Sequence, residues 1–199
     1  MKIAVFGAKG RVGSCIVDVA QRRGHQVCSV DKQNCTTFDT VCDVAIDFST
    51  ACATQIVVDY CTRHKVPLVV GTTGQSEEQL ALLDSLSSIV TVVKKANFSK
   101  GIELMKQACL AVRQQVDWDV AMIETHRKGK LDCPSGTAKE LASVLDCKDV
   151  SSIRLANQLG THTVVFGGEN ECIEITHRAT SVNVFALGAV EIAEKIAKA

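Results

Sequence analysis

The sequence predicts an α/β fold in which a doubly wound parallel sheet is joined to a smaller α+β domain with a mixed or antiparallel sheet. Short apolar runs alternate with helical patterns through the first half of the 199 residues, as they do in parallel sheets with crossover helices. A glycine-rich turn follows the first run, and the alternation stops near residue 98. We therefore expect one domain at 1–98 with 184–199, and a second domain at 99–183.

Five apolar runs in the first half are the expected strands of the parallel sheet. Such strands are covered on both faces, so they are apolar throughout rather than at alternate positions. They lie at 2–6, 26–31, 43–49, 66–74 and 89–99. Helices are expected between them at 11–23, 54–65 and 76–87. Ser76, followed by two glutamates, is a typical helix start, because acidic side chains favour the positive end of the helix dipole.

The second half has another order of elements. A helix at about 101–115 precedes a strand at 118–124, a polar loop and a helix at 137–145. From residue 152 onward, four short runs are expected to form antiparallel strands joined by short turns: SIRLANQ (152–158), HTVVFGG (162–168), ECIEITHRAT (171–180) and VNVFA (182–186). An amphipathic helix at 187–198 is expected to return to the first domain.

Composition and charge exclude several classes of protein. Lys and Arg balance Asp and Glu at 22 each, so no overall basic charge favours nucleic acid or an anionic membrane. No apolar run reaches the roughly 18 residues that span a bilayer, and Gly7, Lys9 and Arg11 interrupt the N-terminal run too early for a signal peptide. The ten cysteines form no CxxC pair and match no zinc spacing. We expect a cytoplasmic protein with free thiols, no metal site, and no nucleic-acid or membrane partner.

The first turn has the composition of a phosphate-binding loop. Gly7-Ala8-Lys9-Gly10-Arg11-Val12-Gly13 joins the first strand to the first helix. Glycines let the backbone approach a pyrophosphate, and free N–H groups at the helix start attract it. Asp31, at the end of the second strand, suits the ribose hydroxyls of NAD, and neighbouring Lys32 suits the 2′-phosphate of NADP. The first domain is therefore expected to be Rossmann-like. A glycine turn with an unrelated aspartate is the alternative.

Two later strands also end in loops that favour ligand binding. Gly71-Thr72-Thr73-Gly74 and Ala96-Asn97-Phe98-Ser99 follow strands whose carboxyl ends share one edge of the predicted sheet. Open α/β sheets bind their ligands at that edge. Ordinary turn formation is the alternative for each loop.

The loop after Glu124 concentrates the residues of a proton-transfer and anion-binding site. His126, Arg127, Lys128 and Lys130 precede Ser135-Gly136-Thr137, where a helix begins. Cations and the N–H groups of a helix start bind carboxylates, and a histidine exchanges a proton near neutral pH. The loop therefore predicts a doubly anionic substrate. The alternatives are a basic surface loop with a chance histidine and, at the helix start, a simple capping box.

Several motifs resemble those of the dihydrodipicolinate reductase family. They are GAKGRVG, IDFS, VVGTTG, ANFSKGI and ETHRKGKLDCPSGTA, followed by Gly160-Thr161-His162, Glu174-Ile175-Thr176-His177 and Phe185-Ala186-Leu187-Gly188-Ala189. They run in order through almost the whole chain, and the E-x-H…K-x-D-x-P-S-G-T-A signature is the most specific of them. The resemblance implies reduction of 4-hydroxy-tetrahydrodipicolinate, a cyclic dicarboxylate, to tetrahydrodipicolinate by NADH or NADPH, in diaminopimelate and lysine biosynthesis.

The resemblance also implies roles for individual residues. His126 would be the general acid and base, and Lys130 a proton donor that also pairs with the substrate. Arg127, Gly136 and Thr137 would bind the substrate carboxylates, together with Ser135 at the same helix start. The cofactor would be bound by Gly7, Ala8, Lys9, Gly10, Arg11, Val12, Asp31, Lys32, Gly71, Thr72, Thr73, Lys95, Ala96, Asn97 and Phe98. Asp31 favours NADH and Lys32 weakens that preference, so we expect use of both cofactors.

Three departures from the family pattern concern substrate affinity and assembly. Arg127 stands where the family often has a second histidine, although an arginine binds carboxylates well. Val182 follows Ser181 where the family has an arginine, and the stretch between Asp146 and Ile153 is short. The resemblance implies a homotetramer joined through the sheets of the second domain, and an oligomer is also expected because a small sheet gains from pairing its exposed edges.

The residues alone leave two other functions open. Another Rossmann-type enzyme, such as an amino-acid or semialdehyde dehydrogenase, would need a catalytic cysteine or lysine elsewhere, and Cys133 is the candidate. A catalytically silent NAD(P)-binding module is the third function, but binding alone does not require both His126 and Lys130.

Overall fold

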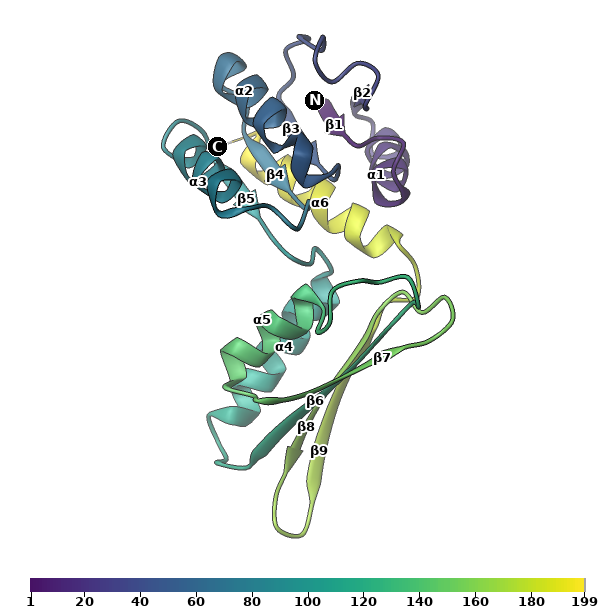
Figure 1. Cartoon of the computed structure of the whole chain (residues 1–199), viewed down its shortest axis with the longest axis vertical. Coiled ribbons are helices and arrows are strands. Elements are labelled where there is room, and N and C mark those ends of the chain that lie inside the picture. Colours follow the sequence, from purple (N-terminus) through teal and green to yellow (C-terminus); the bar gives the residue numbers. More distant parts are fainter. Residues whose placement is uncertain (199) are drawn as a thin grey trace. The chain divides into compact units, whose positions relative to one another are not determined.

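Two sheets, each with its own helices, organise the residues that the structure describes, which are 1–198 (Figure 1). The structure is a computed structural model of the whole chain. It divides into two compact units. The first unit comprises Met1–Phe98 and the segment from Val182 onward, and the second comprises Ser99–Ser181.

The sheet of the first unit is parallel throughout, with the strand order β2-β1-β3-β4-β5. Ile3 and Ala4 of the central strand β1 point to opposite faces, and both are fully buried. Their burial on both sides explains why this strand is apolar without alternation. The strands are β1 (Lys2–Phe6), β2 (Gln26–Val30), β3 (Val44–Asp47), β4 (Leu68–Val70) and β5 (Val92–Lys94).

Helices cover both faces of this sheet (Figure 1). One hydrophobic cluster joins Ile3 and Val5 of the sheet to α1 (Arg11–Arg22) and α6 (Asn183–Ile196). A second cluster joins the opposite face to α2 (Thr54–His64) and α3 (Glu77–Ser87). A short 3₁₀ turn at Ala51–Ala53 leads into α2. The expected doubly wound α/β arrangement is therefore present.

The expected strand at 89–99 is longer than the paired strand β5. The N–H groups of Ile89 and Val90 still bond to the carbonyl of Leu86, at the end of α3. Its neighbour β4 ends at Val70, opposite Lys94, so the ladder has no further partner for Ala96 and the residues after it. These residues form a loop at the carboxyl edge instead.

The run VNVFA at 182–186 was expected to be a strand, and that expectation is wrong. Residues 183–186 form the first turn of α6, which is correspondingly longer than the predicted helix. Ala186, Ala189, Val190 and Ala193 are buried at helical spacing. A Cβ atom at Gly188 would lie 1.8 Å from the carbonyl oxygen of Phe98, so only glycine permits this approach of α6.

The second unit contains a four-stranded mixed sheet with the order β7-β6-β8-β9. Its elements are α4 (Lys100–Arg113), β6 (Asp119–His126), α5 (Gly136–Leu145), β7 (Asp149–Arg154), β8 (Thr161–Gly167) and β9 (Cys172–Arg178). The strand expected at 152–158 begins earlier and pairs parallel to β6, not antiparallel. The reason is α5, which carries the chain back to the start of β6 as a crossover helix.

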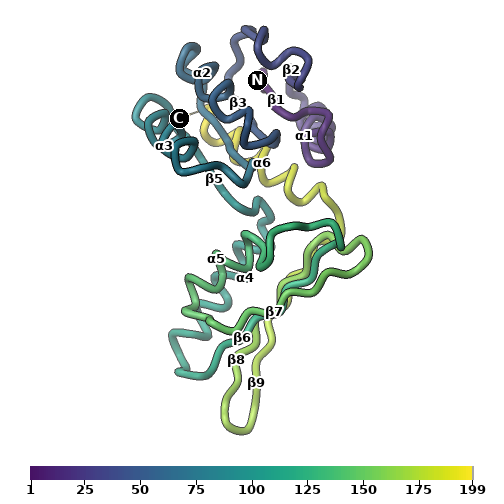
Figure 2. Tube along the Cα trace, viewed as in Figure 1, coloured from purple at the N-terminus to yellow at the C-terminus, as the bar shows by residue number. Residues whose placement is uncertain are grey.

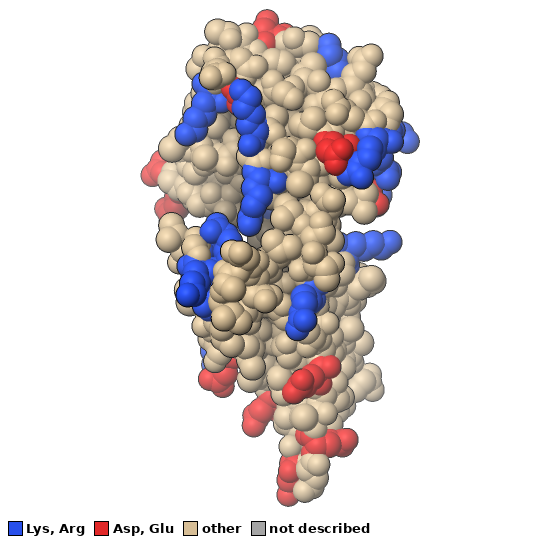
Figure 3. Space-filling model, turned by 90° about the vertical axis from the view of Figure 1, so that its right-hand side faces the viewer, with Lys and Arg blue, Asp and Glu red and all other residues tan. Residues whose placement is uncertain are grey.

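Helices α4 and α5 cover one face of this sheet, and the other face bears no helix among the described residues of the unit (Figure 1). Ile123 and Ile153, on the uncovered face, are 42% and 46% exposed. The β8–β9 hairpin can be followed to its tip in Figure 2. Acidic side chains gather at this end of the unit, where the hairpin carries Glu169, Glu171 and Glu174 (Figure 3). Charge on a hairpin and its edge strand opposes edge-to-edge pairing.

Candidate functional site

The glycines of the first turn pack the backbone too tightly for side chains. Gly7 has a φ of +80°, and a Cβ atom there would lie 2.5 Å from the carbonyl oxygen of Phe48. A Cβ atom at Gly13 would lie 2.0 Å from the carbonyl oxygen of Gly7. Gly10 is the N-cap of α1 and carries no side-chain cap, so the helix start is open to an anion. The turn has the form of a pyrophosphate cradle.

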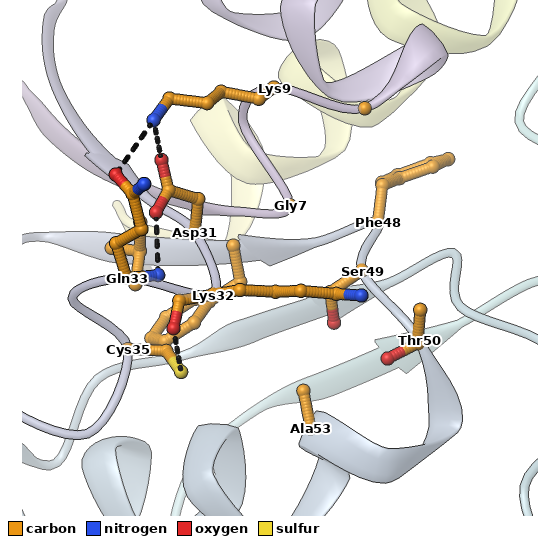
Figure 4. Close-up of a pocket in the computed structure, with 13 residues that line it drawn as sticks. Gly7, Lys9, Asp31, Lys32, Gln33, Cys35, Phe48, Ser49, Thr50 and Ala53 are labelled. Atoms are coloured by element: carbon orange, nitrogen blue, oxygen red, sulfur yellow. Dashed lines mark hydrogen bonds and ion pairs between the residues drawn. The ribbon is translucent and has the colours of Figure 1, made fainter.

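A cavity of about 380 Å³ lies beside this turn (Figure 4). Asp31 forms an ion pair of 2.6 Å with Lys9, and its other oxygen accepts the backbone N–H of Gln33 at 2.9 Å. The bond from Lys9, followed by that from Gln33, lowers the pKa of Asp31. Lys32 extends across the cavity toward Ser49. One side of the cavity therefore carries the Asp31 carboxylate paired with Lys9, and the Lys32 ammonium group lies apart from that pair, beside Ser49.

A second cavity of about 280 Å³ lies at the ends of β4 and β5. Thr72, Thr73, Lys95 and Ala96 line it, so these four predicted cofactor residues lie together. The hydroxyl oxygen of Thr72 accepts the backbone N–H of Ser49 at 3.0 Å, which ties the Thr72 loop to the end of β3. Both cavities are lined by loops that follow strands of the parallel sheet.

Some predicted cofactor residues do not line either cavity. The side chains of Ala8 and Phe98 lie in the hydrophobic core, and the Phe98 ring packs at a tilt against that of Phe48, with 5.3 Å between their centroids. Gly71 makes room for Phe48, because a Cβ atom there would lie 2.2 Å from its ring. Arg11 and Val12 are the first two residues of α1, and the Val12 side chain packs against the hydrophobic core. Asn97 lies in the loop between Ala96 and Phe98 and has interactions of its own.

In the second unit, His126 belongs to a buried polar network. Glu124 is fully buried two residues earlier on the same face of β6, and one of its oxygens bonds to Nδ1 of His126. Arg154, opposite His126 on β7, donates to both oxygens of Glu124 at 3.0 and 2.8 Å. The backbone N–H of Ser135 donates to Glu124 at 3.2 Å. Both oxygens of the Glu124 carboxylate therefore have hydrogen-bond partners.

The network sets the charge of its members. Burial raises the pKa of Glu124, but the bonds from Arg154 and His126 outweigh it and lower that pKa to about 2. Burial lowers the pKa of His126, with Glu124 opposing that change and the cations Lys130 and Arg154 adding to it. At neutral pH the arrangement therefore contains an ionised Glu124 and a neutral His126.

Lys130 and the start of α5 share a carboxylate. Asp132 forms an ion pair of 2.7 Å with Lys130 through one oxygen, and its other oxygen accepts the N–H of Gly136 at 3.2 Å. Arg154 holds this loop by donating to the carbonyls of Lys130 and Asp132. In this structure the Asp132 carboxylate therefore lies between the ammonium group of Lys130 and the N-terminus of α5.

Ser135 is buried and caps α5. Its hydroxyl oxygen accepts the N–H of Ala138 at 3.2 Å and lies 3.2 Å from Nε2 of His162. The His162 ring packs edge-on against the His126 ring, with 5.1 Å between their centroids. Burial, and then the neighbouring His126, lower the pKa of His162 to about 3, so it is neutral at physiological pH.

The two remaining predicted substrate residues differ in exposure. Thr137 is buried in the first turn of α5. Arg127 is exposed, and its guanidinium folds over Gly129, where a Cβ atom would lie 2.5 Å from it. No group of His, Cys, Asp and Glu within residues 1–198 is arranged to hold a metal ion. No helix in that range combines the length and hydropathy needed to cross a bilayer.

Sequence reasoning missed three residues of the network. Glu124 lies in the quoted signature, and its spacing of two from His126 on a strand was a usable signal, because such residues share a face. His162 lies in a quoted motif but received no role. Arg154 had no signal, because its contact with Glu124 spans 30 positions and depends on parallel pairing.

Comparisons with known proteins agree with this architecture. The family model described as dihydrodipicolinate reductase, N-terminus, matches residues 1–98, and that described as dihydrodipicolinate reductase, C-terminus, matches residues 101–199. The 4-hydroxy-tetrahydrodipicolinate reductase of Thermosipho africanus is 40% identical over 199 residues, which cover 98% of this chain and 91% of that protein. The chain belongs to the dihydrodipicolinate reductase family.

Other relatives show that this member of the family is short. The 4-hydroxy-tetrahydrodipicolinate reductase of Clostridium tetani is 32% identical over 230 aligned positions, which cover 96% of this chain and 89% of that protein. Because 230 exceeds the 199 residues of the chain, the relative contains segments without a counterpart here.

Solved structures share the fold. The dipicolinate-bound dihydrodipicolinate reductase of Paenisporosarcina sp. TG-14 matches with a TM-score of 0.75 at 22% identity, covering 100% of this chain and 95% of that one. Aspartate semialdehyde dehydrogenase II of Vibrio cholerae matches with a TM-score of 0.63 at 11% identity, covering 99% and 98%. The second likeness is one of fold alone, and it gives no support to the semialdehyde dehydrogenase alternative.

Proposed function

We propose that this member of the family reduces 4-hydroxy-tetrahydrodipicolinate to tetrahydrodipicolinate with NADH or NADPH, in diaminopimelate and lysine biosynthesis. The substrate gains one hydride and one proton and loses its hydroxyl group as water. The observation that carries the proposal is the linked arrangement of His126, Lys130 and the start of α5. Glu124 bonds to His126 and to Ser135, and Asp132 bonds to Lys130 and to Gly136.

The residues of the second unit bind the dianion and manage its proton. Lys130 and the N–H groups of Gly136 and Thr137 bind the carboxylates, with exposed Arg127 closing over them. Such fixed donors stabilise charge that develops during reaction, and loss of one typically costs about 2.7–4 kcal/mol. His126 and Lys130 are the proton-transferring groups. The nicotinamide supplies the hydride.

The residues of the first unit fit a dinucleotide. The first turn leaves no space for a side chain at Gly7 or Gly13, and it binds the pyrophosphate at the start of α1. Asp31 accepts the ribose hydroxyls of NADH. Lys9 and Lys32 offset its charge when the 2′-phosphate of NADPH is present, so both cofactors are used.

The chain is further proposed to act as a homo-oligomer in the cytoplasm. The uncovered face of the second sheet exposes Ile123 and Ile153, and a second copy would bury them. The tetramer of the family is the expected assembly, which light scattering on the purified protein would measure. All ten cysteines within the described residues are free thiols, as suits a reducing compartment.

A spectrophotometric assay tests the proposal. Oxidation of NADH or NADPH is followed at about 340 nm with freshly made cyclic substrate. The variant His126→Gln is expected to lower kcat by about 100-fold or more, with cofactor affinity unchanged, because a proton-transferring group acts mainly in the transition state. Normal turnover by this variant would refute the role of His126. The absence of any turnover by the unaltered protein would refute the proposed reaction.

A further inference from the structure

We infer that Glu124 is the positioning residue for His126, fixing Nδ1 as the nitrogen that carries the resting proton and leaving Nε2 to exchange a proton with the substrate. Arg154 holds Glu124 in its ionised form. The inference rests on the proposed function, in which His126 exchanges that proton.

The hydrogen bonds around Glu124 determine the direction of its bond with His126. An ionised carboxylate only accepts hydrogen bonds. Arg154 donates to both Glu124 oxygens, at 3.0 and 2.8 Å, and the N–H of Ser135 donates to one of them at 3.2 Å. With Glu124 ionised, the bond to Nδ1 of His126 requires a proton on that nitrogen. The neutral ring must then have an unprotonated Nε2.

Gly160 keeps space open at the other side of the ring. A Cβ atom at this position would lie 3.0 Å from Nε2 and 3.3 Å from Cδ2 of His126. The loop that precedes β8 therefore approaches Nε2 with backbone only. The His126 side chain is 11% exposed and that of Glu124 is fully buried, so the substrate can reach the imidazole but not the carboxylate behind it.

Four titratable or charged groups face His126 from the surrounding elements. Glu124 lies on β6, Arg154 on β7, His162 on β8, and Lys130 in the loop after β6. Burial, Lys130 and Arg154 disfavour the imidazolium, and Glu124 favours it. When Nε2 receives a proton, the positive charge of the ring therefore lies next to the one group that stabilises it. Glu124 acts through His126 and does not touch the substrate.

Nitrogen NMR of the unaltered protein tests the tautomer without any variant. With ¹⁵N-labelled histidine and the His126→Gln variant to assign the signals, Nδ1 of His126 is expected to resonate as a protonated nitrogen above the pKa of the ring, and Nε2 as an unprotonated one. The reverse pattern would overturn the inference. This measurement needs no substrate, so its outcome is independent of whether the proposed reaction occurs.

The variant Glu124→Gln tests the consequence for catalysis. Glutamine keeps the shape but loses the charge, so the pH above which kcat falls is expected to move down by about one unit or more, while KM for the cofactor stays constant. Glu140→Gln is the matched control. It removes a carboxylate on α5 that forms an ion pair of 3.0 Å with Lys106 of α4, and it is expected to leave the pH profile unchanged. An unshifted profile in folded Glu124→Gln would overturn the inference. If Glu124→Gln does not fold, the spectrum of the unaltered protein decides.

Discussion

Arg23 donates two hydrogen bonds to Glu194, at 2.8 and 2.7 Å, and thereby joins the end of α1 to the last helix, α6. His25 bonds to the same carboxylate at 2.7 Å. The two helices also share the hydrophobic cluster on one face of the parallel sheet. The ion pair therefore closes the first unit at a place where its two chain segments meet.

The variant Glu194→Gln is expected to lower the free energy of unfolding by about 1 kcal/mol at pH 7, because the pair is partly exposed. The bond from Arg23 is the main cause that lowers the pKa of Glu194 to about 2 from 4.5. This contribution is complete above pH 4.5 and is lost as the pH falls toward 2. Urea unfolding at pH 7 and pH 3 should thus show a smaller difference at pH 3. Glu169→Gln, on the hairpin tip, is the control, and an equal loss there would contradict the prediction.

The variant Asp31→Ser is expected to shift cofactor preference toward NADPH. It removes the charge that opposes a 2′-phosphate and releases Lys9 from its 2.6 Å ion pair. The ratio of kcat/KM for NADPH to that for NADH should rise by about tenfold. Asp18→Ser removes an equal charge from an exposed pair on α1 and should leave the ratio unchanged. An unchanged ratio in Asp31→Ser would show that Asp31 does not bind the ribose.

The variant Gly13→Ala is expected to weaken cofactor binding by about tenfold or more. The new methyl group would meet the carbonyl oxygen of Gly7 at 2.0 Å, so the turn must open and the pyrophosphate cradle is lost. Titration calorimetry with NADH measures the effect. Gly167→Ala is the control, because no atom lies within 4 Å of its added Cβ. Wild-type affinity in Gly13→Ala would contradict the cradle.

The variant Gly160→Ala is expected to lower kcat by about tenfold while the affinity for NADH stays constant. Its methyl group would approach Nε2 of His126 to 3.0 Å and crowd the nitrogen that we propose exchanges a proton with the substrate. Steady-state kinetics and calorimetry on the same preparation separate the two effects. A loss of cofactor affinity without a loss of kcat would place this position in the other site.

The variant His162→Asn is expected to make the protein less sensitive to acid. Burial lowers the pKa of His162 to about 3 from 6.5, so between these values the unfolded chain binds a proton that the folded protein excludes. The unfolding free energy should therefore fall as the pH drops from about 6.5 toward 3, and fall less steeply in the variant. His64→Asn, which removes a histidine bonded to the exposed Asp39, is the control and should keep the original slope. Parallel slopes for His162→Asn and the unaltered protein would count against a buried neutral His162.

The sequence was most informative where one local pattern had one structural meaning. The unbroken apolar run of β1 predicts burial on both faces of the sheet. Ile3 and Ala4, which point to opposite faces, are both fully buried. VNVFA failed because its apolar residues fit both a two-residue and a 3.6-residue period, and only packing of Ala186 against the sheet decides between them.

The candidate site shows the same limit. His126 and Lys130 were found by residue type and motif. The role of Arg154 depends on the register of β6 with β7, which places it opposite His126. A parallel register is set by contacts between distant segments, so no window of the sequence contains it. The bonds from Arg154 to the carboxylate of Glu124 depend on the same register of β6 with β7.

The division of the first unit between the two ends of the chain has a consequence for biosynthesis. A ribosome releases the chain from its N-terminus, and domains of a nascent chain usually fold in that order. Here the contiguous unit Ser99–Ser181 can fold before α6 has been synthesised. Until then, the face of the parallel sheet that α6 packs against is not fully covered. This face of the sheet is therefore shielded only after residues 183–196 have been synthesised, and until then its apolar side chains are exposed to aggregation.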